Sequence, residues 1–323
     1  MKNKFVHLFL FITLLAYTGC ENAVETVLVG GAEVPYNKIG MSMFPYNTVV
    51  GSLPNQMADI KSLGVNYVRM DLSFDENYMA SAYSGRDFSR FDKYINAADN
   101  AGLDIVAILA YVPNWLRGNP DWKSIYINNY VKPVVKRYKG VVKNWEVWNE
   151  PDDLTYNSLD GSPGDYFDLL KRASTAIRSI DPSATVVSAA TTSIVLGGVD
   201  NWNWTQKLID MGLSQWADVL NFHYYSELDP ELSALGGNMV KNAGMRVWVT
   251  ETGKKGQSNQ ESYFKTVTAY INKSLNPERI YWYTYVAGHL TANGIHPDDT
   301  YGIVTFYNGS IYQSPLYTLL KNR

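Results

Sequence analysis

The sequence is poor in cysteine and carries no marked excess of charge of either sign. Cys20 is the only cysteine among 323 residues, so no disulfide can form within the chain. Charged residues make up 18% of the chain and the formal net charge is −3. No run of Lys or Arg reads as a phosphate-binding patch, so composition gives no reason to expect a nucleic acid partner. The glycine-rich phosphate-binding loop and the Gly-x-Ser-x-Gly turn of serine hydrolases are also missing.

The chain is rich in apolar and aromatic residues. Apolar residues make up 46% of it and aromatic residues 14%, with 24 Tyr and 9 Trp. This composition can bury a large core and is not that of a disordered chain. Most of these aromatics are expected in the core. An aromatic-rich cleft would also suit a carbohydrate, because the flat C–H faces of sugars stack on aromatic rings.

The first twenty residues have the pattern of a targeting segment. Lys2 and Lys4 precede an apolar run over residues 5–16, which is short for a membrane span but typical of a signal peptide. The run ends at Cys20 and resembles the signal of a bacterial lipoprotein, in which the cysteine is acylated. The alternative is ordinary secretion with an incidental cysteine. We expect a signal peptide over residues 1–19, a tether over 20–36, and lipid anchoring in the bacterial cell envelope, either periplasmic or surface-exposed.

Short apolar runs alternate with helical patterns through the rest of the chain, residues 37–323. Near-continuous apolar runs such as residues 105–110 suit strands of a parallel sheet that is buried on both faces. Eight candidate strands can be counted: Lys38–Met43, Asn66–Leu72, Asp104–Tyr111, Val142–Trp148, Thr185–Ala189, Val219–Tyr224, Arg246–Thr250 and Arg279–Tyr285.

Helices are predicted between these strands. The clearest apolar stripe runs from Tyr166 to Ile180 at helical spacing, and others begin at Phe91 and Tyr263. Gly64 and Gly102 look like helix C-terminal glycines that feed the next strand. Eight alternating strand–helix units predict an α/β fold, a single (β/α)8 TIM barrel without a second domain.

Two glutamates end two of the predicted strands. Glu150 lies in Trp148-Asn149-Glu150-Pro151 after the fourth strand, and Glu251 ends the seventh. In such barrels the chemistry sits at the C-terminal ends of the strands, where both glutamates are expected. Two carboxyl groups are the equipment needed to cleave a glycosidic bond, one protonated and one ionised.

These two motifs together resemble clan A of the retaining glycoside hydrolases, with features closest to family 39-like or family 5-like members. The resemblance covers essentially the whole chain after residue 36. It implies that Glu150 is the acid/base, that Glu251 is the nucleophile and that Asn149 binds the sugar 2-hydroxyl. It further implies that Arg69 pairs with the nucleophile, that His223 and Tyr225 contact the two carboxylates, and that Trp282 forms the floor of the cleavage subsite.

Aromatic residues in the loops are weaker candidates. Tyr111, Trp115 and Trp122 follow the third strand and are expected either to stack on sugars or to pack within the loop. Trp202 and Trp204 are expected to pack. His296-Pro297-Asp298-Asp299 does not make up a metal-ligand set, and we expect neither a metal nor a cofactor.

The sequence therefore predicts a retaining β-glycoside hydrolase that acts on a poly- or oligosaccharide, as a monomer tethered to a membrane through Cys20. Three alternatives stay open: a transglycosylase using the same residues, an anchored glycan-binding protein without turnover, and a barrel aldolase or isomerase. The last would need a Schiff-base lysine or a phosphate site at the strand ends, and none is evident. The sugar and the linkage are not predicted.

Overall fold

The computed structural model describes residues 33–154, 158–195, 201–287 and 293–323. The predicted signal peptide, Cys20 and all of the predicted tether except residues 33–36 lie outside the described residues. Within the described part of the chain, no helix combines the length and apolar character needed to cross a membrane.

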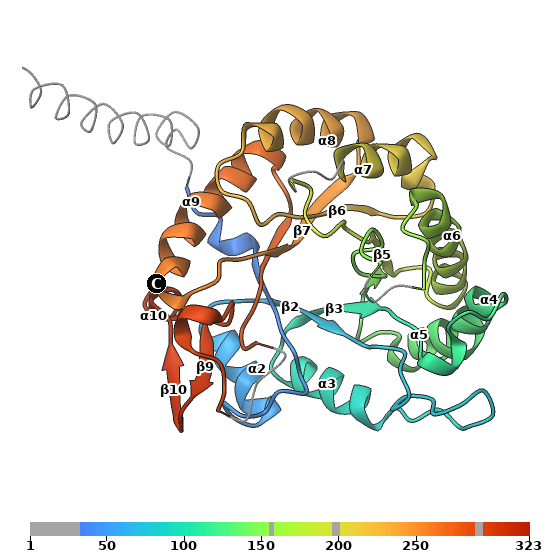
Figure 1. Ribbon diagram of the computed structural model, residues 1–323, viewed down its shortest axis with the longest axis horizontal. Coiled ribbons are helices and arrows are strands. Elements are labelled where there is room, and N and C mark those ends of the chain that lie inside the picture. The colour runs from blue at the N-terminus through green and yellow to red at the C-terminus, as the bar shows by residue number, and fades with distance from the viewer. Residues whose placement is uncertain (1–32, 155–157, 196–200, 288–292) are drawn as a thin grey trace, which may run out of the picture.

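Eight parallel strands close into a barrel in chain order, with β8 paired to β1 (Figure 1). The predicted (β/α)8 barrel is confirmed, with strand ends that differ from the predicted ones by a few residues. The strands are β1 (Ile39–Ser42), β2 (Tyr67–Asp71), β3 (Asp104–Leu109), β4 (Asn144–Val147), β5 (Thr185–Ser188), β6 (Val219–His223), β7 (Arg246–Thr252) and β8 (Arg279–Trp282).

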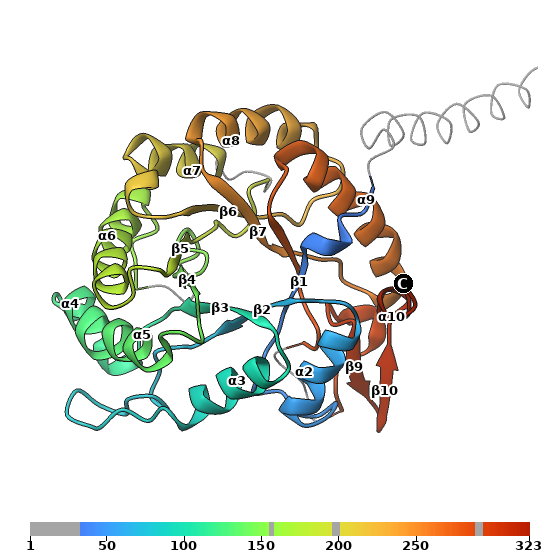
Figure 2. The same ribbon diagram turned by 180° about the vertical axis from the view of Figure 1, so that it is seen from behind.

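Helices surround the barrel, and Figure 2 shows the same ring from behind. They are α2 (Leu53–Ser62), α3 (Ser89–Asn100), α4 (Trp122–Tyr126), α5 (Lys132–Tyr138), α6 (Pro163–Ile180), α7 (Asn201–Asp210), α8 (Gly237–Ala243), α9 (Gln257–Leu275) and α10 (Pro315–Lys321). A hairpin of β9 (Val304–Tyr307) and β10 (Ser310–Gln313) precedes α10 and lies outside the barrel.

The predicted helical stripe from Tyr166 to Ile180 corresponds to α6. The Ser162 side chain caps its start by accepting a hydrogen bond from the backbone N–H of Asp165. The apolar stripe of α6 is buried from Tyr166 to Ile177. Gly64 and Gly102 both have positive φ, at 75° and 67°, which glycine adopts without steric cost.

The inside of the barrel changes from apolar to polar along the strands. Val106, Val187, Val219, Trp248 and Tyr281 form a buried apolar cluster there. Because side chains alternate along a strand, residues two positions further on point the same way, closer to the strands' C-terminal ends. On β6 and β7 those positions hold Asn221, two after Val219, and Thr250, two after Trp248, and both are buried. The apolar layer thus supports a polar layer that lies directly beneath the site.

Candidate active site

Glu150 follows β4 on an unusual stretch of backbone. Trp148 and Glu150 both have positive φ, 75° and 45°, a region that non-glycine residues adopt at a cost of about 1–3 kcal/mol each. The Trp148 ring is buried and packs edge-on against the ring of Tyr111, and this contact helps to hold the backbone turn at Trp148 in place. Asp152, two residues further on, accepts hydrogen bonds from the backbone N–H and hydroxyl of Thr192, which follows β5. The loop that carries Glu150 is therefore hydrogen-bonded to the segment that follows β5.

Glu251 reaches the barrel opening because β7 is irregular. The pairing register shifts between Phe222 and His223 on β6, and again on the β8 side between Val249 and Thr252. Such bulges re-aim side chains near active sites. Here both Thr250 and Glu251 make hydrogen bonds inside the barrel, although a regular strand would send neighbouring residues to opposite faces.

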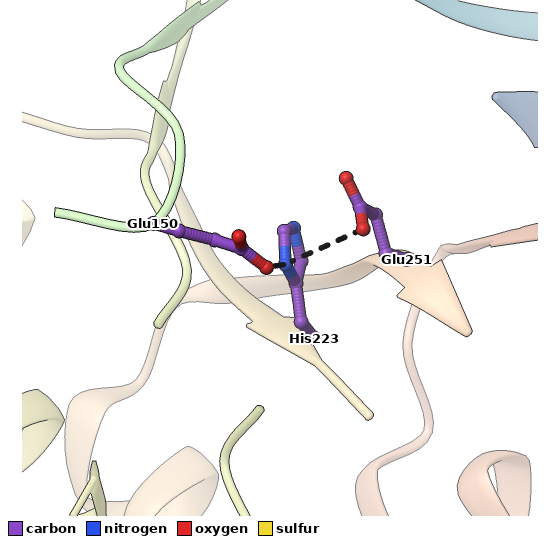
Figure 3. Close-up of side chains that lie close together, drawn as sticks. All are labelled: Glu150, His223 and Glu251. Atoms are coloured by element: carbon purple, nitrogen blue, oxygen red, sulfur yellow. Dashed lines mark hydrogen bonds and ion pairs between the residues drawn. The ribbon is translucent and has the colours of Figure 1, made fainter. Parts of the chain in front are cut away.

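The two glutamates lie on either side of His223 (Figure 3). One carboxylate oxygen of Glu150, one of Glu251 and a ring nitrogen of His223 all lie within 4.8 Å of one another. His223 Nδ1 is 2.9 Å from Glu150 Oε1 and 3.7 Å from Glu251 Oε2. The imidazole Nε2 lies 3.1 Å from the Thr250 hydroxyl, which orients the ring.

Arg69 connects three strands beneath these groups. Its Nη1 donates to Glu251 Oε1 at 2.5 Å, and its Nε donates to Glu146 Oε2 at 2.7 Å. Its Nη2 donates to Glu146 Oε1 at 2.9 Å and to Asn149 Oδ1 at 2.7 Å. Arg69 and Glu146 are almost fully buried, so these are charge-assisted bonds in a site that excludes water. The predicted contact between Arg69 and Glu251 is present.

The surroundings move the pKa values of the two glutamates in opposite directions. Burial raises the pKa of Glu150 above its ordinary value, and the hydrogen bond with His223 only partly opposes this. Burial would also raise the pKa of Glu251, but His223, Arg69 and the Tyr225 hydroxyl outweigh it and lower that pKa. Burial would lower the pKa of His223, yet the two glutamates raise it. Compared with an ordinary carboxyl group, Glu150 thus holds its proton more strongly and Glu251 holds its proton less strongly.

The other predicted residues around the glutamates also converge. The Tyr225 hydroxyl donates to Glu251 Oε2 at 2.6 Å, and Asn149 Nδ2 donates to the Tyr111 hydroxyl at 3.1 Å. Asn149, Tyr111 and both glutamates line a cleft of about 690 Å³ at the barrel opening. Its size is within the range of small-molecule and saccharide sites.

Among the predicted site residues outside the cleft lining, His223 and Tyr225 contact the glutamates, whereas Trp282 and Trp115 contact neither the glutamates nor the cleft. Trp282 is buried at 1% exposure and packs against Tyr263 and Phe264 of α9, because its position on β8 turns the ring outward to the helix layer. Trp115 packs edge-on against Phe74 and donates its indole N–H to the carbonyl of Met79. The assignments of Trp282 as subsite floor and of Trp115 as a sugar platform were therefore wrong, and Trp115 takes its loop-packing alternative.

Three other loop and helix tryptophans also pack within the fold. The Trp122 ring lies against those of Tyr126 and Trp148. Trp204 is buried and donates to the carbonyl of Gly161, and Trp202 donates to Glu231. For Trp202 and Trp204, the packing role predicted from the sequence is confirmed.

Several residues of the site were missed from the sequence. Tyr283, one position beyond Trp282, lines the cleft and contacts the rings of Phe44, Tyr225 and Tyr301. The period-two alternation from Tyr281, inside the barrel, would have indicated Tyr283 rather than Trp282. Glu146 was also missed, although a glutamate inside an apolar strand run is a signal in itself, because a buried carboxylate needs a partner.

Glu150, His223 and Glu251 are residue types that ligate metal ions. However, Arg69 and Tyr225 already occupy one oxygen each of Glu251, so a cation would have to approach a buried guanidinium. The His296 segment has a different role, because His296 Nδ1 accepts a hydrogen bond from the backbone N–H of Asp298 and caps a short helix.

Comparison with known protein families shows to which family of barrel enzymes this chain belongs. Residues 29–288 match the family model described as Cellulase (glycosyl hydrolase family 5). The chain belongs to glycosyl hydrolase family 5. Comparison with curated proteins finds no match. Family 5 membership agrees with one of the two families that the sequence motifs resemble.

Solved structures similar to this family 5 chain share its barrel. A family 39 glycoside hydrolase from Bacteroides cellulosilyticus aligns with a TM-score of 0.63 at 17% identity, over 88% of this chain and 62% of that one. A β-xylosidase from Caulobacter crescentus gives 0.67 at 17% identity, over 90% and 68%. An endoglucanase from Thermotoga maritima gives 0.58 at 18% identity, over 78% and 92%. At these identities the likeness establishes the fold alone, and the chain spans less than two thirds of the family 39 protein.

Replacement of Arg69 tests the ion-pair network. Arg69→Met would leave Glu146 and Glu251 buried without their cation, and we expect it to lower the free energy of unfolding by about 3–5 kcal/mol at neutral pH. Arg172→Met is the matched control, because Arg172 pairs with Asp168 at the surface and should contribute less than about 1 kcal/mol. Urea unfolding would measure both. Equal losses in the two variants would contradict a structural role for the buried network.

Proposed function

We propose that this family 5 protein is a retaining β-glycoside hydrolase in which Glu251 is the nucleophile and Glu150 is the acid/base. The observation that carries the proposal is the pair of carboxylates, with an oxygen of each within 4.8 Å of the other and with pKa values shifted in opposite directions. Retaining enzymes have carboxyl groups about 5–5.5 Å apart, whereas inverting enzymes leave room for a water between more distant ones.

The reaction proceeds by two displacements. In the first, a Glu251 oxygen bonds to the anomeric carbon, the glycosidic C–O bond breaks, and Glu150 gives its proton to the departing oxygen. In the second, the Glu150 carboxylate takes a proton from water, the water oxygen bonds to the anomeric carbon, and the bond to Glu251 breaks. Each step inverts the anomeric carbon, so the two together retain its configuration.

The surrounding residues have separate tasks in this mechanism. Arg69 and Tyr225 hold Glu251 ionised and aim one of its oxygens. His223 lies 2.9 Å from Glu150, where it can stabilise the carboxylate that forms once the proton has left. Asn149 is fixed by Arg69 and Tyr111 at the edge of the cleft, in position for a sugar hydroxyl.

A transglycosylase would use the same groups, with a sugar hydroxyl in place of water in the second step. A glycan-binding protein without turnover would not require opposite pKa shifts on two adjacent carboxyl groups, and this observation favours an enzyme. The substrate, a poly- or oligosaccharide, has to be found by experiment.

Substitution of each glutamate gives a different expected result. Glu251→Gln should lower turnover by at least about 1,000-fold without unfolding the protein, since no nucleophile remains. Glu150→Ala should also lower cleavage, but azide should partly restore it on an aryl glycoside with a good leaving group, because the small anion enters the space left by Glu150, bonds to the anomeric carbon on the face opposite Glu251 and displaces the Glu251 carboxylate. The glycosyl azide should have the β configuration. An α-glycosyl azide, or near-normal activity in either variant, would contradict the roles assigned.

The deciding experiment is the release of reducing ends from β-glucans, mannans, xylans, galactans and bacterial exopolysaccharides, run beside Glu251→Gln. Activity on one polymer that disappears in the variant would establish hydrolysis and name the substrate class. Binding without release in the wild-type protein would favour the glycan-binding alternative, and longer products would favour transglycosylation.

The pH dependence of kcat/KM should reflect both shifted groups. Activity requires Glu251 ionised and Glu150 protonated, so the acid limb should lie below the ordinary carboxyl pKa of 4.5 and the basic limb above it. His223 lowers the pKa of both glutamates, and His223→Gln should therefore move both limbs to higher pH. His296→Gln, which alters an exposed histidine outside the catalytic pair, is the control. Unmoved limbs in His223→Gln would refute this coupling.

We further propose that residues 1–19 direct export and that Cys20 carries the lipid anchor. The basis is the sequence pattern alone, an apolar run that ends in the only cysteine of the chain. Expressed in a bacterial host, the wild-type protein should fractionate with membranes and Cys20→Ser should not, because stable anchoring needs acyl chains. Release of the wild-type protein by a carbonate wash would contradict acylation.

A further inference from the structure

One carboxylate in the cleft has no task in the mechanism described above. Asp71 is the last residue of β2, two positions after Arg69, and therefore points into the barrel opening above it. It lines the cleft together with both glutamates and Asn149. Its place is thus beside the catalytic pair, on the side of the cleft formed by β2 and β3.

Asp71 is held in this place without a partner for its charge. Within residues 33–154, 158–195, 201–287 and 293–323, no hydrogen bond or ion pair engages its carboxylate. The cation that acts on its pKa is Arg69, which is already shared between Glu146 and Glu251. Burial, followed by the neighbouring glutamates, raises the pKa of Asp71 to about 6, with Arg69 opposing the shift. Asp71 is partly exposed at the cleft, and a carboxylate that loses part of its hydration without gaining a partner destabilises the folded protein.

Tyrosine side chains surround the same carboxylate. Tyr46, Tyr111 and Tyr283 line the cleft, and Asp71 is among the groups that raise the pKa of each of them after burial. A carboxylate that accepts hydrogen bonds, set among aromatic rings that can lie against C–H faces, has the chemistry of a sugar subsite. The cleft wall here also carries Glu76 and Arg117, while Asp75 is paired with Arg90, so the unpaired acceptor in this part of the wall is Asp71, which suits the hydroxyl groups of a neutral sugar better than an anionic group.

We propose that Asp71 is a specificity-determining residue, which accepts hydrogen bonds from hydroxyl groups of a neutral sugar bound beside Glu251. The inference rests on the proposed function. It adds that the protein recognises the hydroxyl groups of the sugar that face Asp71 at the end of β2. An unpaired carboxylate that costs stability is the kind of residue that a binding site retains, because substrate hydroxyl groups satisfy it when they arrive. Asn149 and Asp71 then contact the sugar from neighbouring positions around the opening.

The test combines Asp71→Ala with a set of substrates that each lack one hydroxyl group. Dinitrophenyl glycosides of the sugar found in the polymer survey would be made as the parent compound and as its 3-, 4- and 6-deoxy forms. In the wild-type protein, at least one deoxy form should lose about 10- to 100-fold in kcat/KM, as expected for a hydrogen bond to a charged group. In Asp71→Ala the parent compound should lose a similar factor, and the penalty for that same deoxy form should disappear.

Stability gives a second, independent readout that needs no turnover. Asp71→Ala should raise the melting temperature at pH 7 by a few degrees, because it removes an unpaired, partly buried charge, whereas a structural carboxylate would lower it when removed. Asp299→Ala is the matched control, since Asp299 also lines the cleft but is 66% exposed and faces Lys255. It should change neither the deoxy penalties nor the melting temperature.

The outcomes separate this inference from the proposed function. Unchanged deoxy penalties in Asp71→Ala, in an enzyme that is active, would overturn the role of Asp71 and leave hydrolysis standing. A lower melting temperature for Asp71→Ala would overturn it as well, by indicating a structural carboxylate. A wild-type protein that cleaves no glycoside would refute the proposed function instead, and Asp71 would then be judged on the stability result and on whether Asp71→Ala weakens glycan binding.

Discussion

The buried ion pairs of Arg69 are the constraint on which the site depends. Arg69 on β2 holds Glu146 on β4 and Glu251 on β7, so one guanidinium connects three separate strands of the barrel. Desolvated charges are tolerated only when they are paired with good geometry. Movement of Glu251 away from this position would therefore break its ion pair with Arg69 and disturb the paired Glu146. The contact with Arg69 also lowers the pKa of Glu251.

A second constraint is imposed by backbone that departs from regular strand geometry. The bulge on β7 turns Glu251 into the opening, and the positive φ of Trp148 and Glu150 turns the β4 loop toward it. The apolar layer around Trp248 and Tyr281 supports both arrangements from below. Local conformations of this kind persist when the surrounding structure over-determines them, and they are concentrated at functional sites.

The cleft combines the two properties that a glycoside requires. Its aromatic wall, where Tyr283 contacts Phe44, Tyr225 and Tyr301, offers flat apolar surface, while Asn149, Asp71 and the two glutamates offer polar contacts. His223 lies between the two glutamates and lowers the pKa of both, while they raise the pKa of His223. Family membership, geometry and electrostatics consequently point to the same class of reaction.

The sequence by itself determined the architecture and the positions of the two glutamates, Glu150 and Glu251, at the end of the barrel. Apolar runs alternating with helical stripes are local signals, and they were sufficient for eight strands, for α6, and for the helix ends at Gly64 and Gly102. Glu150 and Glu251 could be assigned to one face because all strands of a (β/α)8 barrel end there.

Only the tertiary structure decided which neighbouring side chains face the cleft. Trp282 and Tyr283 are adjacent aromatics of similar size, and the register of β8 against β1 and β7, not their composition, sends one outward and the other inward. Glu146 and Asp71 acquire their significance in the same way. Glu146 pairs with Arg69 from another strand, whereas the carboxylate of Asp71 is unpaired within the described residues. Contacts between distant strands arise only when the barrel closes.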